Sequence, residues 1–306
     1  MSKWNTIKKI LKKPKKIIRI LGDKKMFNWL NDKSYLKLLF YCEMGYKLDL
    51  KNPKTFNEKL QWLKLNDRKE FYNILVDKYN VREYISNTIG NEYLIPLIDV
   101  YYSVEEINWD VLPNSFVIKC THGSGSNIIC KDKRSLDIKQ AKKRLKKWMK
   151  KNWYWFGREW VYKDLKPKII IEKHMALNQK YLEDYKVLCF GGKAKLIQVH
   201  LDRYDNHTQD YYDINFNKTE ISQGNSSNKI IEKPKVFDEM IKLSEKLSKD
   251  LAHARIDWYI VDNKLYFGEI TFFDGSGLWP FDDFNDDLMI GSWIDLNKVN
   301  NSYNNE

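Results

Sequence analysis

The most informative stretch of the chain is Phe116-Val117-Ile118-Lys119-Cys120-Thr121-His122-Gly123-Ser124-Gly125-Ser126-Asn127. Its apolar first half predicts a strand, which carries Lys119 to a loop of small residues. Glycines let a backbone bend closely around an anion and direct N–H groups at it, and the lysine adds a positive charge. We interpret this stretch as a phosphate-binding loop. A plain hairpin loop is the alternative, because the sequence fits neither the Walker A nor the GxGxxG pattern.

A second group of polar residues lies on two strand-like runs toward the end of the chain. Alternation of side chains puts Arg255 and Asp257 on one face of the first run, and Glu269 and Thr271 on one face of the second. Asp262-Asn263 between the runs indicates a hairpin turn, so these side chains can converge. Two carboxylates and a hydroxyl suit Mg²⁺, which bridges nucleotide phosphates. The alternative is a pair of acids that face solvent.

A third candidate region is the end of the apolar run Ile169-Ile170-Ile171, which predicts a strand. The run changes abruptly to Glu172-Lys173-His174-Met175. At such an exit, a carboxylate and free backbone groups can meet the edge of a purine, although an ordinary strand end has the same pattern. Elsewhere, Arg203 and Arg255 are candidates for neutralising a phosphoryl group during its transfer.

The remaining sequence predicts an α+β chain with a mostly antiparallel sheet in its second half. A helical region from Met26 to about Leu65 is interrupted near Lys51-Asn52-Pro53, and Thr55 with Glu58 forms a capping-box pattern after the break. We expect further helices at 77–85, 135–151 and 236–252, and strands at 93–102, 115–120, 168–171, 185–190, 194–201, 256–261 and 265–271.

Two basic segments have more than one interpretation. Residues 1–25 form an amphipathic helical pattern broken by Pro14, which could lie on an anionic membrane or pack on its own domain. Residues 135–151 are also basic, and the aromatic residues 153–156 follow them. Basic and aromatic residues together can bind single-stranded nucleic acid, but more often such a helix covers a sheet. We expect no nucleic-acid partner.

Composition limits the class of protein. The 306 residues are 43% hydrophobic and 14% aromatic, which excludes a wholly disordered chain, and the net charge of +12 favours anionic partners. No CxxC pair occurs among Cys42, Cys120, Cys130 and Cys189, so we expect reduced thiols and a cytoplasmic protein. No apolar run is long enough to span a bilayer, and the basic N-terminus does not predict a signal peptide.

The order of these parts resembles the ATP-grasp superfamily and, more narrowly, its TupA-like branch, named for teichuronopeptide biosynthesis. The resemblance covers about residues 52–296. It rests on Asn52-Pro53-Lys54-Thr55-Phe56-Asn57-Glu58-Lys59-Leu60, Asp77-Lys78-Tyr79, residues 117–126, Asp184-Tyr185-Lys186-Val187 and Gly268-Glu269-Ile270-Thr271-Phe272.

The resemblance implies an ATP-grasp fold, in which two α+β lobes clasp ATP, with an N-terminal helical extension. The expected divisions are a basic helical arm at 1–25, an N-terminal helical region at 26–114, a small lobe at 115–175, a catalytic lobe at 176–296 and a disordered tail at 297–306.

The same resemblance implies roles for individual residues. Those expected to contact ATP are Lys78, Lys119, Gly123, Ser124, Gly125, Ser126, Glu172, Lys173, His174, Met175, Asp184 and Lys186. Those expected to hold Mg²⁺ are Asp257, Glu269 and Thr271, the last at a position where many members have asparagine. Arg203 and Arg255 would hold the phosphate or a developing acyl phosphate, and His122 is the histidine to test first because it lies in the phosphate loop.

The activity implied by the resemblance is that of an ATP-dependent carboxylate–amine ligase in cell-surface polysaccharide biosynthesis. Its substrates would be an acidic sugar or glycan and an amine or amino acid, and residues 273–279 are a candidate acceptor loop. One alternative is a glycan kinase that uses the same ATP site. Another is a non-enzymatic protein that binds polyanions through its lysines. We also consider peripheral contact with the inner membrane face through residues 1–25.

Overall fold

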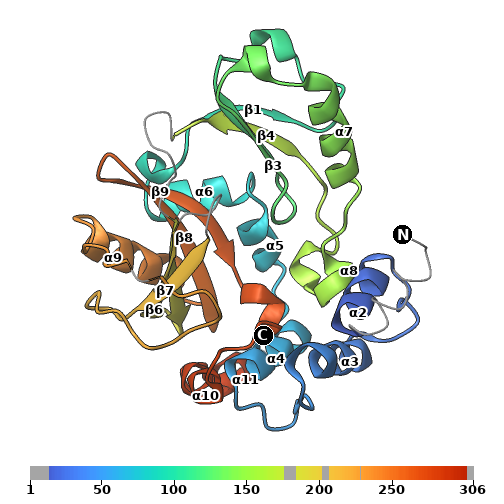
Figure 1. Cartoon of the computed structure of the whole chain (residues 1–306), viewed down its shortest axis with the longest axis vertical. Helices are drawn as coiled ribbons and strands as arrows, with labels where there is room; N and C mark the ends of the chain where they lie inside the picture. The colour runs from blue at the N-terminus through green and yellow to red at the C-terminus, as the bar shows by residue number, and fades with distance from the viewer. Residues whose placement is uncertain (1–13, 176–183, 202–206, 228, 302–306) are drawn as a thin grey trace.

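Two antiparallel sheets organise the chain, one in each of two lobes (Figure 1). The computed structural model describes residues 14–175, 184–201, 207–227 and 229–301. Helices surround both sheets, which confirms the α+β class expected from the sequence. No helix in these ranges combines the length and the apolar character needed to cross a membrane.

The smaller sheet has the strand order β1-β4-β2-β3, formed by β1 (Leu97–Tyr101), β2 (Phe116–Cys120), β3 (Asn127–Cys130) and β4 (Ile169–Lys173). Helix α7 (Ile138–Met149) packs on this sheet through Ala141 and Leu145, so the basic helix covers a sheet as one interpretation expected. Strand β1 precedes residue 115, where the small lobe was expected to begin. The lobe starts earlier because β1 pairs with β4.

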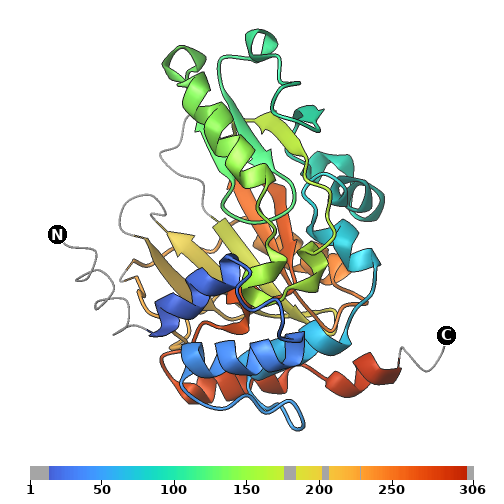
Figure 2. The same ribbon diagram turned by 90° about the vertical axis from the view of Figure 1, so that its right-hand side faces the viewer.

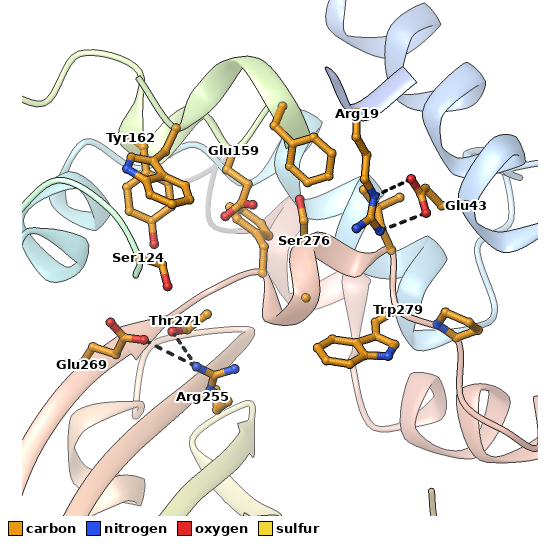
Figure 3. Close-up of a pocket in the computed structure, with 16 residues that line it drawn as sticks. Arg19, Glu43, Ser124, Glu159, Tyr162, Arg255, Glu269, Thr271, Ser276 and Trp279 are labelled. Atoms are coloured by element: carbon orange, nitrogen blue, oxygen red, sulfur yellow. Dashed lines mark hydrogen bonds and ion pairs between the residues drawn. The ribbon is translucent and has the colours of Figure 1, made fainter. Parts of the chain in front are cut away.

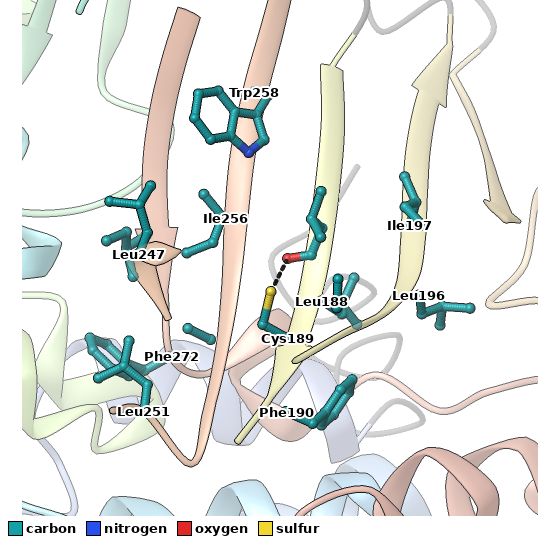
Figure 4. Close-up of a cluster of buried hydrophobic side chains, with 14 of the residues drawn as sticks. Leu188, Cys189, Phe190, Leu196, Ile197, Leu247, Leu251, Ile256, Trp258 and Phe272 are labelled. Carbon is teal, nitrogen blue, oxygen red and sulfur yellow. Dashed lines mark hydrogen bonds between the residues drawn. The ribbon is translucent and has the colours of Figure 1, made fainter. Parts of the chain in front are cut away.

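The larger sheet has the order β7-β6-β5-β8-β9, formed by β5 (Asp184–Phe190), β6 (Lys193–Leu201), β7 (Thr208–Tyr212), β8 (His253–Val261) and β9 (Lys264–Thr271). Helix α9 (Phe237–Leu247) packs against its central strands. Figure 4 shows part of the resulting core, in which Leu247 of the helix lies beside Ile256, and Leu188 and Ile197 of the neighbouring strands belong to the same cluster. This core holds β5, β8 and β9 in place.

The hairpin expected from the sequence is present as β8 and β9. Asp257 pairs with Glu269, and Arg255 pairs with Thr271. The register then shifts, so that Trp258 pairs with Phe267 and Gly268 is the extra residue of a β-bulge. Both carboxylates therefore lie on the same face of the sheet, directly opposite each other.

Figure 2 shows the N-terminal helices α2 and α3 on the side of the molecule that faces the viewer. The helices in this part of the chain are α2 (Pro14–Asp23), α3 (Asp32–Met44), α4 (Phe56–Asn66), α5 (Phe71–Val76) and α6 (Val81–Thr88). The predicted capping box is present at α4, where Thr55 accepts from the Glu58 N–H and Glu58 accepts from the Thr55 N–H.

The remaining helical segments are short. They are α8 (Tyr154–Gly157), α10 (Phe284–Ser292), α11 (Leu296–Asn301) and the 3₁₀ turns η1 (Asn91–Tyr93), η2 (Trp109–Val111), η3 (Lys133–Ser135), η4 (Trp160–Tyr162) and η5 (Asp274–Gly277). Part of the tail expected to be disordered instead forms α11, because Val299 packs into the larger core. Residues 302–306 lie outside the described ranges.

The expected basic arm also differs from the prediction. Pro14 was expected to break a helix, but it is the first residue of α2, a position where its missing N–H costs nothing. The helix packs on its own domain, where Arg19 Nε lies 2.6 Å from Glu43 Oε1. Residues 1–13 lie outside the described ranges.

Candidate functional site

A cavity of about 340 Å³ opens between the two sheets, and we call it the lysine cavity. It is lined by Lys78, Lys119, Ser124, Gly125, Ser126, Asn127, Lys186, Asp257, Tyr259, Gly268 and Glu269. The structure thus brings together eight of the predicted ATP and metal residues from segments far apart in the sequence. The three lysines give the cavity the positive charge that a polyphosphate requires.

Asp257 and Glu269 face the lysine cavity from neighbouring strands, and cations surround both. Arg255 donates to both oxygens of Asp257, from Nε to Oδ1 at 2.7 Å and from Nη2 to Oδ2 at 2.8 Å, and Lys186 forms an ion pair with the same carboxylate. Lys78 Nζ lies 2.8 Å from Glu269 Oε2. Arg255 Nη2 lies 3.6 Å from Glu269 Oε1, so one guanidinium bridges the two acids.

These cations oppose the effect of burial on the two carboxylates. Burial raises the pKa of Asp257, although the charges of Arg255 and Lys186 act in the opposite direction. Burial would also raise the pKa of Glu269, but Lys78, Arg255 and Lys186 together hold it well below its usual value. Glu269 is therefore ionised at neutral pH, as a metal-binding carboxylate must be.

The acid pair fits a magnesium ion as two of its ligands. Both carboxylates reach one cavity, and Mg²⁺ commonly takes one or two protein carboxylates and completes its shell with phosphate oxygens and water. Thr271, the predicted third ligand, does not line the lysine cavity, and its hydroxyl lies 3.3 Å from Arg255 Nη2. Within the described ranges, no cluster of three or more His, Cys, Asp or Glu side chains forms a metal site.

The loop between β2 and β3, which we interpreted as a phosphate-binding loop, borders the lysine cavity. Ser124, Gly125 and Ser126 line it, and Gly125 adopts a φ of +68°, which favours glycine. Gly123 does not line the cavity, but its carbonyl oxygen accepts from Lys78 Nζ at 2.8 Å. Lys78 thus connects the loop to Glu269 in the other lobe.

Glu172 lies beside the lysine cavity, in a buried ion pair. Its Oε2 is 2.7 Å from Lys119 Nζ and its Oε1 is 3.2 Å from Arg82 Nη1. A small hollow next to it is lined by Lys78, Arg82, Leu94, Lys119, Ile170, Glu172, Phe267 and Gly268. This hollow, where the resemblance places the adenine, is thus lined by both apolar and charged side chains.

The three residues after Glu172 lie outside these cavities. The Lys173 backbone was expected to be free, but its N–H donates to the carbonyl oxygen of Pro96 at 2.9 Å. This bond forms because β4 pairs with the segment that leads into β1. Neither His174 nor Met175 lines the lysine cavity or the hollow beside Glu172.

Three further predicted residues lie elsewhere. His122 is buried, and its Nε2 is 3.2 Å from the carbonyl oxygen of Trp148 and 3.1 Å from that of Lys151. It ties the loop to the end of α7 and lines neither cavity described in this subsection. Asp184 lies behind the lysine cavity, 3.0 Å from Lys186 Nζ. Arg203 lies outside the described residues.

A second, larger cavity of about 540 Å³ adjoins the first, and we call it the aromatic cavity (Figure 3). It is lined by Arg19, Glu43, Ser124, Trp153, Phe156, Glu159, Tyr162, Arg255, Glu269, Thr271, Phe273, Gly275, Ser276, Leu278, Trp279 and Pro280. Ser124 and Glu269 line both cavities, so the two spaces meet at these two residues. Much of the predicted acceptor loop, residues 273–279, lies on its wall.

Several lining residues of the aromatic cavity were not predicted from the sequence. Trp153 and Phe156 belong to the aromatic run 153–156, for which the sequence suggested base stacking beside a basic helix and not a place in a cavity. Glu159 and Tyr162 follow that run closely, and the abrupt gathering of aromatic residues was the signal available. No local pattern marks Arg19 and Glu43 as pocket residues.

Two side chains of α4 form hydrogen bonds to the backbone of the predicted acceptor loop, residues 273–279. Lys64 is fully buried, and its Nζ donates to the carbonyl oxygens of Ser276 and Gly157, each at 2.8 Å. Gln61 Nε2 donates to the carbonyl oxygens of Ser276 and Gly277. Burial lowers the pKa of Lys64 to about 8, although the charge of Glu159 opposes this.

The sequence matches the model of one known protein family. The model of the family described as TupA-like ATPgrasp matches residues 58–295, which is most of the chain. No curated protein matches the sequence.

Among solved structures, the chain is similar to an ATP complex of D-alanine–D-alanine ligase from Bacillus anthracis, at 19% identity and a TM-score of 0.40 over 65% of this chain and 55% of that one. It is similar to L-amino acid ligase from Bacillus licheniformis, at 10% identity and a TM-score of 0.43 over 82% and 57%. An ADP complex of N5-carboxyaminoimidazole ribonucleotide synthetase matches at 12% identity and 0.44 over 79% and 56%. The chain spans little more than half of the length of each.

Proposed function

Because the chain belongs to the TupA-like ATP-grasp family, we propose that it is an ATP-dependent ligase that joins a carboxylate to an amine. One observation carries the proposal. Asp257 and Glu269, paired across two strands, line the same cavity as the three lysines and the glycine-bearing loop. Beside Glu269, that cavity meets a second one with room for substrates.

The residues suit a reaction in two steps. A substrate carboxylate is a poor electrophile, so its oxygen first attacks the γ-phosphorus of ATP, which gives an acyl phosphate and releases ADP. An amine then displaces inorganic phosphate and leaves an amide. Such chemistry depends mainly on positioning and on positive charge near the transferring group.

The charged groups and the glycine-bearing loop of the lysine cavity each have a role in this reaction. Lys78, Lys119 and Lys186 would neutralise the phosphates, and the small residues 124–126 let them approach the backbone. Asp257 and Glu269 would hold magnesium, which supplies further positive charge on the phosphates. Arg255 lies between the acid pair and the aromatic cavity, where it would stabilise the acyl phosphate.

The proposed biological setting is the synthesis of a cell-surface polysaccharide in the cytoplasm, such as a capsule or a teichuronopeptide. The carboxylate substrate would be a uronic acid or another acidic sugar or glycan, and the second substrate an amine or amino acid. The family name and the net charge of +12 support this setting.

The test is an assay of the purified chain with magnesium, ATP and paired panels of uronic acids and amines. We expect release of ADP and phosphate that requires both substrates, with an amide detected by mass spectrometry. Asp257→Asn should lower the rate at least about a hundredfold, because it removes a metal ligand. Asp250→Asn, at an exposed position, is the matched control.

Three results would contradict the ligase proposal. Absence of phosphate release with every pair would remove its basis. A stable phosphorylated sugar without an amide would instead identify a kinase. Steeply salt-dependent binding of polyanions that is indifferent to Mg²⁺-ATP and unchanged in Asp257→Asn would identify a binding protein.

We also propose peripheral contact of residues 1–25 with an anionic inner membrane face. Exposed Lys24 and Lys25 beside exposed Met26 and Trp29 support it, because charge and apolar groups together favour an interface. Flotation with vesicles containing an acidic lipid should recover the chain at low salt. Equal recovery with neutral vesicles, or no recovery, would contradict this contact.

A further inference from the structure

Glu159 has an unusual position on the wall of the aromatic cavity. The rings that line the same cavity are those of Trp153, Phe156, Tyr162, Phe273 and Trp279. Figure 3 shows the Glu159 carboxylate pointing into this space beside Ser276. A carboxylate among aromatic faces is costly unless a cation or hydrogen-bond donor accompanies it.

The cations near this cavity are committed to other acids. Arg19 pairs with Glu43 through two hydrogen bonds, at 2.6 and 2.9 Å. Arg255 is shared by Asp257, Glu269 and Asp274. In the part of the chain that the structure describes, no lysine or arginine nitrogen lies within 4.0 Å of Glu159.

The buried Lys64 is the cation whose charge acts on Glu159, but its ammonium group donates to other acceptors. These acceptors are Gln61 Oε1, the carbonyl oxygens of Gly157 and Ser276, and Ser276 Oγ. The Ser276 hydroxyl also interacts with Glu159, and the nearby Asp274 adds a like charge. The aromatic cavity therefore carries a surplus of negative charge at Glu159.

We propose that the aromatic cavity binds the amine substrate as its ammonium ion, with Glu159 as the counter-ion and as the acceptor of its first proton. This inference rests on the proposed ligase function. Two independent features of the cavity favour an ammonium ion. The first is the charge of Glu159, and the second is the set of aromatic faces, whose quadrupoles attract cations.

The proton balance of the second step follows from this placement. The ammonium ion gives one proton to a Glu159 carboxylate oxygen and becomes a neutral amine. Its lone pair forms the C–N bond at the acyl carbon, and the C–O bond to phosphate breaks with its electron pair on phosphate. The departing phosphate takes the second proton, and Glu159 returns its own to water.

The environment of Glu159 supports this role. Burial raises the pKa of Glu159, while the charge of Lys64 and the hydroxyl of Ser276 oppose the shift and Asp274 reinforces it. A carboxyl group with a raised pKa accepts a proton from an ammonium ion more readily than an ordinary one does.

Binding can be measured without knowing the natural amine. The probes are ethanolamine, 1,4-diaminobutane and lysine, each compared with a neutral alcohol of similar shape, by ligand-observed NMR in the presence of Mg²⁺-ADP. We expect the amines to bind and the alcohols not to. Glu159→Gln should weaken amine binding at least about tenfold, which is the loss of one charged partner, and change nucleotide affinity less than about twofold.

Two further variants make the result interpretable. Glu220→Gln, at an exposed position away from the cavity, should leave amine binding unchanged. Trp279→Leu should weaken it about fivefold through loss of an aromatic face. Since Trp279 is 49% exposed, this variant tests the cavity even where Glu159→Gln fails to fold.

Binding and activity separate the inference from the proposed function. Unchanged amine binding in Glu159→Gln, equal binding of alcohols, or tighter binding of glucuronate than of any amine would overturn the inference alone. Absence of ligase products while amines still bind through Glu159 would count against the proposed function alone. Where turnover is found, Glu159→Gln should raise the KM for the amine about tenfold but leave trapping of the acyl phosphate by hydroxylamine unchanged.

Discussion

Each carboxylate of the lysine cavity already has cationic partners before a nucleotide arrives. Glu269 faces Lys78 and Arg255, and Asp257 faces Lys186 and Arg255. Loss of one partner would leave a charge poorly compensated in a largely buried site. Residues that bind phosphate in the proposed complex therefore also keep the free protein electrically balanced.

Lys78 offers a direct test at this scale. Its ammonium joins the Gly123 carbonyl to Glu269, and we expect Lys78→Met to weaken ATP binding about 10- to 100-fold, as for loss of a charged hydrogen bond. Calorimetric titration with an ATP analogue measures this. Lys139→Met, at an exposed position on α7, should bind as the natural chain does. Equal affinities for both variants would contradict the assignment.

His253 makes a prediction about pH. Its ring is buried beside Phe56 and Phe190, and burial lowers its pKa to about 4. Because the unfolded chain binds this proton more readily between pH 6.5 and 4, stability falls as pH drops through that window, by up to about 3 kcal/mol.

Urea unfolding at pH 7 and pH 4.5 would measure this loss. In His253→Gln the difference between the two pH values should shrink by about 2 kcal/mol. An unchanged difference would show that other groups, such as His122 and His174, whose pKa values burial also lowers, account for the acid sensitivity.

Single residues of the site were predictable to different degrees. Asp257 and Glu269 were found because side-chain alternation and a hairpin turn are local patterns. Glu159 and Lys64 were missed because their environment comes from Ser276, which is more than a hundred residues away. His122 was proposed as a site residue because it lies in the loop. Its ring nitrogen instead contacts carbonyl oxygens at the end of α7, and the sequence does not show that the end of α7 packs there.

At the scale of elements, the β8–β9 hairpin is the part that positions the acid pair. The bulge at Gly268 lies one residue from Glu269 and lines the lysine cavity. A Cβ at this position would come within 3.0 Å of the Asp257 carbonyl oxygen and 3.3 Å of the Asp257 Cβ. The glycine therefore lets the two strands approach closely.

Gly268→Ala should displace Asp257 and lower ligase activity about tenfold, since small misplacements at a reacting centre are costly. The melting temperature should change little, because the neighbours need to move only a few tenths of an ångström. Activity assays and thermal melts of the same preparation separate these effects. Full activity in Gly268→Ala would contradict the idea that the close approach of β8 and β9 at Asp257 is needed for activity.

Helices and strands that have their own caps, turns or apolar runs were predicted well, whereas several short helices and strands were not. The capping box of α4 and the strands β5, β6, β8 and β9 follow from caps, turns and apolar runs. The sequence did not predict α5, β3, β7 or α10. The strands β3 and β7 are short edge strands, which form through pairing with β2 and β6 rather than through their own pattern.

At the scale of the whole molecule, the lysine cavity joins the two lobes. Lys119 comes from the smaller sheet, and Lys186 and the acid pair come from the larger one. A ligand held there contacts both lobes. It should therefore stabilise the chain as a unit rather than one lobe alone.

We expect Mg²⁺-ATP at a hundred times its dissociation constant to stabilise the folded chain by about 2.7 kcal/mol. Thermal melts followed by fluorescence should show one transition that moves upward with nucleotide concentration. Asp257→Asn should reduce the shift when magnesium is present. Two transitions, of which only one responds, would contradict a shared site.

The wall of the aromatic cavity has a further consequence. Arg19 on α2 and Glu43 on α3 line this cavity, yet both precede residue 58, where the match to the family begins. The residues that line the lysine cavity, where we propose that ATP binds, lie wholly inside the matched span. Related chains could thus acquire a different acceptor by exchanging only their leading helices, so that substrate choice would diverge in evolution while the energy-coupling apparatus stayed intact.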